Sequence, residues 1–196
     1  MSYIDYQKKF VTLTKAAEAV QSGDVIWIGS TLSIPITFLD RLAARADALK
    51  NVTLIGSMFV RSHVLFTDLR YQDSFKVISI VGRQMMPKAM ANVQFIYNAG
   101  GSVIENICMK YGINALAVEV CPTDTNGICG FGAFGTHMTS YVNSYEGIKK
   151  RIVIINDFQP EGGKDERDFV DLSSCDFIAI SHHKLFSTDE HDAPQP

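Results

Sequence analysis

The sequence lacks several features that mark common functional classes of protein. It has 18 Lys and Arg residues among 196, but no basic run of the kind that binds nucleic acid. Its apolar stretches have the length of strands, which argues against a membrane-spanning helix, and its N-terminus lacks the apolar core of a signal peptide. We therefore expect a cytoplasmic protein that binds neither nucleic acid nor a membrane.

Cysteine is scarce, and its spacing indicates neither a disulfide framework nor a zinc site. The four cysteines form no C-x-x-C pair and lie mostly in or beside apolar runs, so reduced, buried thiols are predicted. Cys121, Cys129 and His137 are spaced too widely for structural zinc. The stretch "DTNG" at 124–127 echoes part of a calcium loop, but residues without a side-chain oxygen occupy the loop's first and last ligand positions. An Asp/Asn/Gly turn explains it, and no metal site is predicted.

Short apolar runs are abundant, and most are continuous rather than alternating. Such runs are typical of strands buried on both faces, as in a parallel sheet covered by helices. Helical patterns lie between them at 14–22, 33–49, 102–112 and 136–147, and Ser33 is the expected N-cap of the second. We expect an α/β fold: a doubly wound, mostly parallel sheet with helices on both faces, in one domain over 1–186 with a flexible tail at 187–196. The predicted strands are 24–29, 51–57, 75–81, 93–99, 115–120, 151–157 and 176–181.

The stretch "GFGAFG" at 130–135 has the G-x-G-x-x-G spacing of a dinucleotide-binding loop. In such a loop the first glycine follows the strand directly, so that the pyrophosphate meets the N-terminus of the next helix. Here "CPTDTNGIC" separates Val120 from Gly130, which places the glycines about ten residues late, although Asp157 lies at about the expected distance. The alternative is a glycine-rich loop whose backbone passes close to another chain or a ligand.

No histidine or nucleophile stands out as catalytic. His182 and His183 close a predicted strand, where adjacent side chains point to opposite faces, so a surface or capping role is expected for them. A structural role is expected for His63. The sequence has no G-x-S-x-G motif and no cysteine in an obviously activating setting, so no nucleophile is predicted.

Glycine and polar residues gather where predicted strands end, in the segments 28–31, 55–58, 81–84 and 122–127. Ligands of open parallel sheets bind beyond the carboxyl ends of the strands, and small residues there let a ligand approach backbone N–H groups. The alternative is that these glycines only shape the turns after the strands. The residues expected along this edge are Gly29, Ser30, Gly56, Ser57, Gly82 and Arg83.

Several ordered segments resemble the acetyl-CoA hydrolase/transferase family, which includes butyryl-CoA:acetate and 4-hydroxybutyrate CoA-transferases. The opening "MSYIDYQKKFVTLTKAAEAVQSGDVIWIG" and "LDRLAARADALKNVTLIGS" resemble its first helices and strands. "ALAVEVCPTDTNGICGFGAFGTH" is similar to its signature, and "IKKRIVIINDFQP" to its following strand. The segment "YNAGGSVIENI" and Asn114 depart from the family pattern, which leaves acyl specificity open. The resemblance covers residues 1–186 and concerns the family's N-terminal domain.

The resemblance implies a domain of the CoA-transferase fold in an enzyme that contains two such halves. In this family a glutamate of the C-terminal half attacks the acyl-CoA thioester, giving an acyl-glutamyl anhydride and then a glutamyl-CoA thioester. Glu105 and Glu119 match no catalytic motif, so no catalytic residue is expected in this chain. The expectation is one subunit of a split, heteromeric CoA-transferase whose nucleophilic glutamate lies on a partner chain. Coenzyme A and acyl-CoA would be substrates, with no permanently bound cofactor.

The resemblance also suggests which residues line the acyl pocket. The loop from Pro122 to Phe131 would lie near the acyl group or the acceptor carboxylate. Ser57 and the backbone N–H groups around Gly56 would contact the thioester oxygen, and Arg83 a carboxylate. The full set is Gly29, Ser30, Gly56, Ser57, Met58, Arg83, Thr123, Asp124, Asn126, Gly127 and Phe131.

Other functions remain open on the same scaffold. A hydrolase, lyase or decarboxylase subunit would place different chemistry on the same fold. A module that binds CoA esters without turnover would need no catalytic partner, and a dinucleotide-binding oxidoreductase is the weakest alternative. A chain built to meet a second half should expose an apolar face when it is alone.

Overall fold

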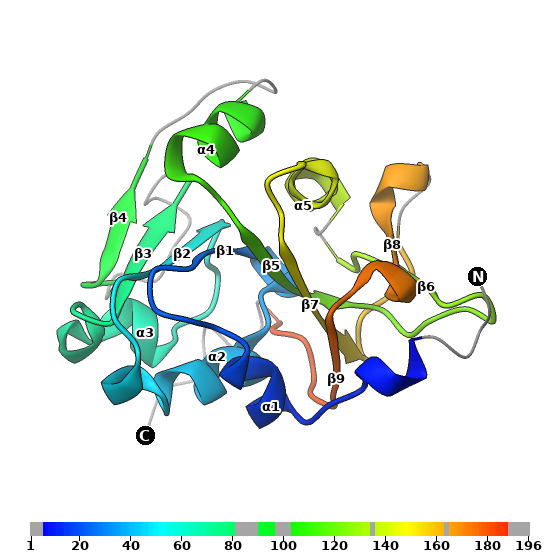
Figure 1. Ribbon diagram of the computed structural model, residues 1–196, viewed down its shortest axis with the longest axis horizontal. Helices are drawn as coiled ribbons and strands as arrows, with labels where there is room; N and C mark the ends of the chain where they lie inside the picture. Colours follow the sequence, from blue (N-terminus) through cyan, green and yellow to red (C-terminus); the bar gives the residue numbers. More distant parts are fainter. Residues whose placement is uncertain (1–5, 81–89, 97–102, 134–135, 163–164, 188–196) are drawn as a thin grey trace.

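A seven-stranded parallel sheet forms the centre of the molecule (Figure 1). The computed structural model describes residues 6–80, 90–96, 103–133, 136–162 and 165–187. Each predicted strand run overlaps one of these strands, and every neighbouring pair is parallel, so the predicted α/β fold is confirmed. In spatial order the strands are β4 (Val93–Phe95), β3 (Phe75–Ser79), β2 (Val52–Ser57), β1 (Val25–Ser30), β5 (Ala115–Val120), β7 (Lys150–Asn156) and β9 (Phe177–Ser181).

Helices cover both faces of the sheet, as predicted. α1 (Leu13–Glu18), α2 (Ile36–Ala43) and α3 (Val64–Thr67) lie on one side, and α4 (Val103–Tyr111) and α5 (Thr136–Ser144) lie on the other (Figure 1). The two faces hold separate buried apolar clusters, which explains why the strands read as continuous apolar runs. Short 3-10 turns join these elements at Gln7–Lys9, Thr31–Ser33, Ala46–Ala48, Leu69–Tyr71, Glu166–Asp168 and Leu172–Ser174.

The strand order reverses direction in the middle of the sheet. The chain runs outward from β1 to β4, returns to β5 beside β1, and then runs outward to β9. The loops after β1 and β5 therefore leave the sheet at a topological switch point, where a crevice opens in doubly wound folds.

A second, two-stranded sheet was not predicted. β6 (Ile128–Gly130) pairs antiparallel with β8 (Phe169–Asp171), and β8 packs against α5. Each strand has only three residues, and no apolar run of strand length marks either one. The pairing joins segments about 40 residues apart, so it depends on tertiary packing rather than on local pattern.

The expected helix at 33–49 is shorter than predicted. α2 begins after Pro35, which takes the N-cap position expected for Ser33. The residue before a proline avoids helical backbone, and Ile34 is accordingly extended with φ −71° and ψ 122°. Past Ala43 the helix gives way to the turn at Ala46–Ala48. The ends of the predicted strands 75–81 and 93–99 lie outside the described residues, as do residues 188–196 of the predicted tail.

The predicted buried thiols are confirmed. Cys108, Cys121, Cys129 and Cys175 are all free and buried. Burial raises the pKa of Cys108 to about 11, and those of Cys129 and Cys175 to about 12. Within the described part of the chain, no helix is long and apolar enough to cross a membrane.

Candidate functional site at the carboxyl edge of the sheet

The ends of β1 and β2 and the turns that follow them carry unusual backbone. Gly29 has φ 86°, and the non-glycine residues Thr31 and Met58 have φ 52° and 49°. A Cβ atom at Gly29 would lie 2.9 Å from the carbonyl oxygen of Ser33, and one at Gly56 would lie 2.9 Å from that of Gly29. The two glycines therefore shape these turns and let them pack together, whereas the positive φ of Thr31 and Met58 is strain of the kind that gathers at functional sites.

Two buried hydroxyl groups at the same edge have no hydrogen-bond partner among the described residues. They are Ser57 Oγ at the end of β2 and Thr31 Oγ1 directly after β1. Ser57 is fully buried. Ser30, in contrast, is committed to its own turn, because its N–H donates to Ser33 Oγ at 3.1 Å and its carbonyl accepts from the same hydroxyl at 2.8 Å. Buried hydroxyls without a partner are rare in folded proteins, so Ser57 and Thr31 are candidates for contact with a ligand.

A small cavity opens beside Thr31. Its volume is about 20 Å³, which is room for about one water molecule or the tip of a ligand. Arg61, after β2, brings a positive charge that has no ion pair or hydrogen bond among the described residues, and His183, after β9, forms another part of the wall. The remaining lining is mostly apolar: Leu32, Ile34, Ile36, Val60, Leu185 and Phe186.

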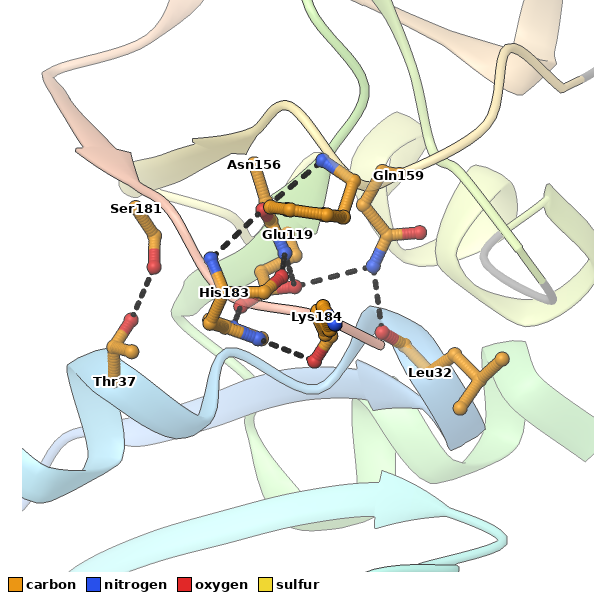
Figure 2. A network of polar contacts seen from close by, with 9 residues as sticks. Leu32, Thr37, Glu119, Asn156, Gln159, Ser181, His183 and Lys184 are labelled. Carbon is orange, nitrogen blue, oxygen red and sulfur yellow. Dashed lines mark hydrogen bonds and ion pairs between the residues drawn. The ribbon is translucent and has the colours of Figure 1, made fainter. Parts of the chain in front are cut away.

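A buried carboxylate lies next to this cavity. Glu119 in β5 is fully buried, and its Oε1 lies 2.6 Å from His183 Nε2 (Figure 2). Its Oε2 accepts hydrogen bonds from Asn156 Nδ2 at 3.2 Å and from Gln159 Nε2 at 3.1 Å. These residues come from the ends of three neighbouring strands, so Glu119 lies at the centre of a polar network in an otherwise apolar sheet.

Gln159 extends the network to two further loops. Its Nε2 also donates to the carbonyl of Leu32 at 2.6 Å, and its Oε1 accepts from the N–H of Ala133 at 3.1 Å. Gly132 has φ 63°, and a side chain there would collide with the Gln159 amide. In "GFGAFG", Gly130 is part of β6 and Gly132 makes room for Gln159, so both glycines have structural roles without a pyrophosphate.

His183 makes polar contacts through its backbone N–H, its carbonyl and both ring nitrogens. Asn156 receives its backbone N–H at 3.4 Å and donates to its carbonyl at 3.1 Å. The ring Nδ1 lies 3.0 Å from the carbonyl oxygen of Lys184, so both ring nitrogens face oxygen acceptors. The hydrogen bond to Glu119 raises the pKa of His183 above its usual value of 6.5, against the opposing effects of burial and of Arg61.

The other two histidines differ from His183. His63 caps α3: its Nδ1 accepts from Leu65 N at 3.2 Å, while its Nε2 meets Asp40 Oδ1 at 3.1 Å. Burial lowers its pKa, and the structural role expected for it is confirmed. His182 is exposed and lies 2.7 Å from Asp157 Oδ2. For His183 the expected surface or capping role is wrong, because its ring pairs with the fully buried Glu119. The two residues are 64 apart, so no local pattern links them.

The predicted loop from Pro122 to Phe131 contains a turn around Asp124, whose polar groups bond one another, and then continues into β6. Asp124 Oδ1 accepts from Asn126 N and Ile128 N, both at 2.8 Å, and these backbone hydrogen bonds lower the pKa of Asp124. Thr123 Oγ1 donates to the Asp124 carbonyl at 3.0 Å.

The remaining predicted residues of this region are held by packing. Gly127 has φ 83° and packs against the ring of Tyr6, and Phe131 is fully buried in the core. Gly82 and Arg83 lie outside the described residues. Beside the loop is an open hollow of about 400 Å³, lined by Cys121, Pro122, Asp124, Ile128, Gly130, Glu161, Gly162 and Phe169. No group of three or more potential metal ligands occurs among the described residues.

Comparisons with known proteins identify the fold. No protein-family model matches the sequence, and a search of the curated proteins finds no significant match. Among solved structures, RipA from Yersinia pestis is similar with TM-score 0.80 and 18% identity over 93% of this chain and 44% of its own. A 4-hydroxybutyrate CoA-transferase from Porphyromonas gingivalis is similar with TM-score 0.69 and 13% identity, over 93% of this chain and 42% of its own.

In a third similar structure, the match covers most of both chains. The decarboxylase AibA/AibB, solved as a point variant, has TM-score 0.55 and 10% identity, and the match covers 88% of this chain and 82% of that one. The chain spans less than half of the RipA and 4-hydroxybutyrate CoA-transferase structures. At these identities the similarity shows a CoA-transferase-like fold, in agreement with the resemblance seen in the sequence, but not a particular member.

Proposed function

We propose that this chain is one subunit of a CoA-transferase that moves CoA between an acyl-CoA and a carboxylic acid, and that a partner chain supplies the nucleophilic glutamate. The observation that carries the proposal is the structural match of nearly the whole chain to less than half of a 4-hydroxybutyrate CoA-transferase. The strained, partly unsatisfied edge formed by the loops after β1 and β2 supports it, because a ligand would complete the hydrogen bonds left open there.

In this proposal the chain binds and polarises the thioester. The Ser57 hydroxyl and backbone N–H groups near Gly56 donate to the oxygen that becomes negative when a carboxylate attacks the thioester. Arg61 pairs with the carboxylate of the acid substrate, a role that the sequence suggested for Arg83. The loop from Pro122 to Phe131 lies beside the acyl group. Binding energy from the remote part of CoA drives the attack, which is unfavourable in water.

Glu119 is not a candidate for the nucleophile. Its carboxylate is fully buried, and His183, Asn156 and Gln159 contact it on both oxygens. A nucleophilic carboxylate needs an oxygen that is free to attack the thioester carbon, and both oxygens of Glu119 are already engaged. This supports a glutamate from a second chain.

Co-expression tests the proposal directly. We would express the chain with the product of an adjacent reading frame that resembles the C-terminal half, purify the complex, and measure exchange of CoA between acyl-CoA and free carboxylic acids by chromatography. The expected result is a stable complex that exchanges CoA, whereas neither chain does so alone. A chain that forms no complex and stays a monomer without an exposed apolar face would overturn the proposal.

A decarboxylase subunit is the second candidate, favoured by the match to most of a chain of the decarboxylase AibA/AibB. The same complex would then release CO₂ from an acyl-CoA without needing an acceptor acid. Binding of CoA esters by the isolated chain, with no turnover in any complex, would instead indicate a binding module. Titration with NAD(H), followed by the fluorescence of the buried Trp27, tests the dinucleotide alternative.

A further inference from the structure

Glu119 connects the two walls of the small cavity. One wall is the strained turn after β1, which Gln159 holds by its hydrogen bond to Leu32 O while it also donates to Glu119. The other wall is the part of the segment after β9 that runs from His183 to Phe186. Strained backbone persists only where contacts with the surrounding structure stabilise it. The hydrogen bond from Gln159 to the carbonyl of Leu32 is such a contact, one residue from the strained Thr31.

The contacts of His183 fit a charged ring beside an ionised Glu119. The carbonyl of Lys184 can only accept, so Nδ1 carries a proton when the 3.0 Å contact is a hydrogen bond. An ionised Glu119 also accepts, so Nε2 carries a proton at 2.6 Å as well. With both protons the ring is an imidazolium that neutralises the buried carboxylate. If the ring loses one proton, one of the two contacts becomes a repulsion between lone pairs.

We propose that Glu119 is a positioning residue that fixes both walls of the cavity, holding the turn at Thr31 and Leu32 through Gln159 and the segment from His183 to Phe186 through the His183 imidazolium. The identity of what the cavity binds rests on the proposed function, but the geometry of the walls does not. Glu119 acts on the site only through its neighbours, and its charge links the arrangement of the walls to pH.

The direction of this pH dependence follows from the groups that face His183. Glu119 from β5 and the Lys184 carbonyl favour the protonated ring, and Arg61 from the segment after β2 opposes it. Because the pKa of His183 is raised above 6.5, the arrangement is complete below that pH and is lost as pH rises through the raised pKa.

Hydrogen–deuterium exchange on the full chain tests the proposal without any substrate. In Glu119→Ala, we expect amides in 31–34 and 183–186 to exchange about tenfold faster than in the wild type at neutral pH, because three donors lose their acceptor. Amides of β2 and β3 report global unfolding, so a purely structural loss of stability would speed them and leave the walls unchanged, as expected in Leu54→Ala, a core variant of β2. Glu105→Gln, on the exposed surface of α4, is the matched control.

The Glu119→Gln variant keeps the shape of the side chain but removes its charge, so it tests the role of the charge alone. A glutamine amide can accept from Gln159 and Asn156 and donate to a neutral His183, so every hydrogen bond survives without an ion pair. We expect this variant to keep both walls protected from neutral to alkaline pH. Nuclear magnetic resonance of the His183 ring should show a lower titration midpoint than in the wild type.

Two outcomes overturn the proposal. One is wild-type exchange at both walls in Glu119→Ala. The other is an unchanged His183 midpoint in Glu119→Gln, which decides the question even if Glu119→Ala does not fold. Exchange data and His183 titration can support the proposal while CoA exchange fails in the co-expressed complex, so a failure of the proposed function is distinguishable from a failure of this inference.

Discussion

Each edge of the parallel sheet holds an ion pair that is at least partly buried, but the two pairs differ in their surroundings. At the amino edge, Asp24 lies 2.7 Å from Lys150 Nζ and also accepts from Gln21 N at 2.9 Å. At the carboxyl edge, Glu119 lies 2.6 Å from His183. Only the carboxyl-edge pair contains a histidine, a side chain that ordinarily titrates near neutrality. The carboxyl-edge pair can therefore respond to pH.

Backbone and hydroxyl groups show the same contrast. Asn51, before β2, has φ 57°, a conformation that asparagine tolerates. Thr31, after β1, has φ 52°, a conformation that is strained for its β-branched side chain. Ser74, before β3, donates to Ala46 O at 2.6 Å, whereas Ser57, at the end of β2, is buried without a partner among the described residues. The amino edge is locally satisfied. The carboxyl edge carries strain and open hydrogen bonds, which marks it as the place for a ligand.

Removing each acid should give the largest difference between the edges. Glu119→Ala leaves His183 and two amide donors without an acceptor in a dry site, so we expect it to lower the free energy of unfolding by about 3 kcal/mol or more. Asp24→Ala should cost about 1.5 kcal/mol, since its site is partly open to water. Urea unfolding at neutral pH measures both. Equal losses would show that the edges do not differ in this respect.

The pH dependence of stability should separate the contributions of two histidines, His63 and His183. Burial lowers the pKa of His63, so its contribution is present above 6.5 and is lost as pH falls through the lowered pKa. The contribution of His183 is present below 6.5 and is lost as pH rises through its raised pKa. Urea unfolding from about pH 5 to about pH 9 should show both losses, each smaller than that of Glu119→Ala.

Two variants test which histidine causes the acid-side loss of stability and which causes the alkaline-side loss. His63→Asn, which can still cap α3, should flatten the acid side, and Glu119→Gln the alkaline side. A profile in which Glu119→Gln keeps the alkaline loss would contradict the assignment to His183.

Relief of backbone strain should have a smaller effect. Thr31→Gly removes both the strained side chain and its unpartnered hydroxyl, and we expect it to raise the free energy of unfolding by about 1 kcal/mol. Asn51→Gly should change it by less than about 0.5 kcal/mol. Thermal unfolding measures both variants. A loss of stability in Thr31→Gly would mean that the side chain makes contacts that outweigh the strain.

The two serines should give the smallest effect on stability but a clear effect on function. Ser57→Ala removes no hydrogen bond within the described chain, so stability should stay within about 0.5 kcal/mol, whereas Ser74→Ala should cost about 1 kcal/mol. In the co-expressed complex, Ser57→Ala should lower CoA exchange by about tenfold or more through the lost donor, and Ser74→Ala should leave it unchanged. Full exchange activity in Ser57→Ala would remove Ser57 from the site.

The sheet was predictable because its signal is local, whereas much of the site was not. Continuous apolar runs such as "ALAVEV" identify buried strands within a few residues. The glycines and serines at the ends of β1 and β2 were found because they close such runs, and Ser57 proved to be unpartnered among the described residues. The glutamate within "ALAVEV" was the available signal for the buried network, because a charge in a doubly buried strand needs a partner. Its partner could not be found, because His183 is 64 residues away.

The sequence by itself determined the strands, the parallel α/β class and the edge at which small and polar residues gather, because hydrophobic periodicity and turn residues act over a few neighbouring positions. Only the tertiary structure decided that Gln159 and Glu119 join the "GFGAFG" loop to the turn after β1, and that His183 closes the network. These contacts depend on strands that become neighbours when the chain returns to β5 beside β1, and pairing at that distance leaves no periodic trace in the sequence.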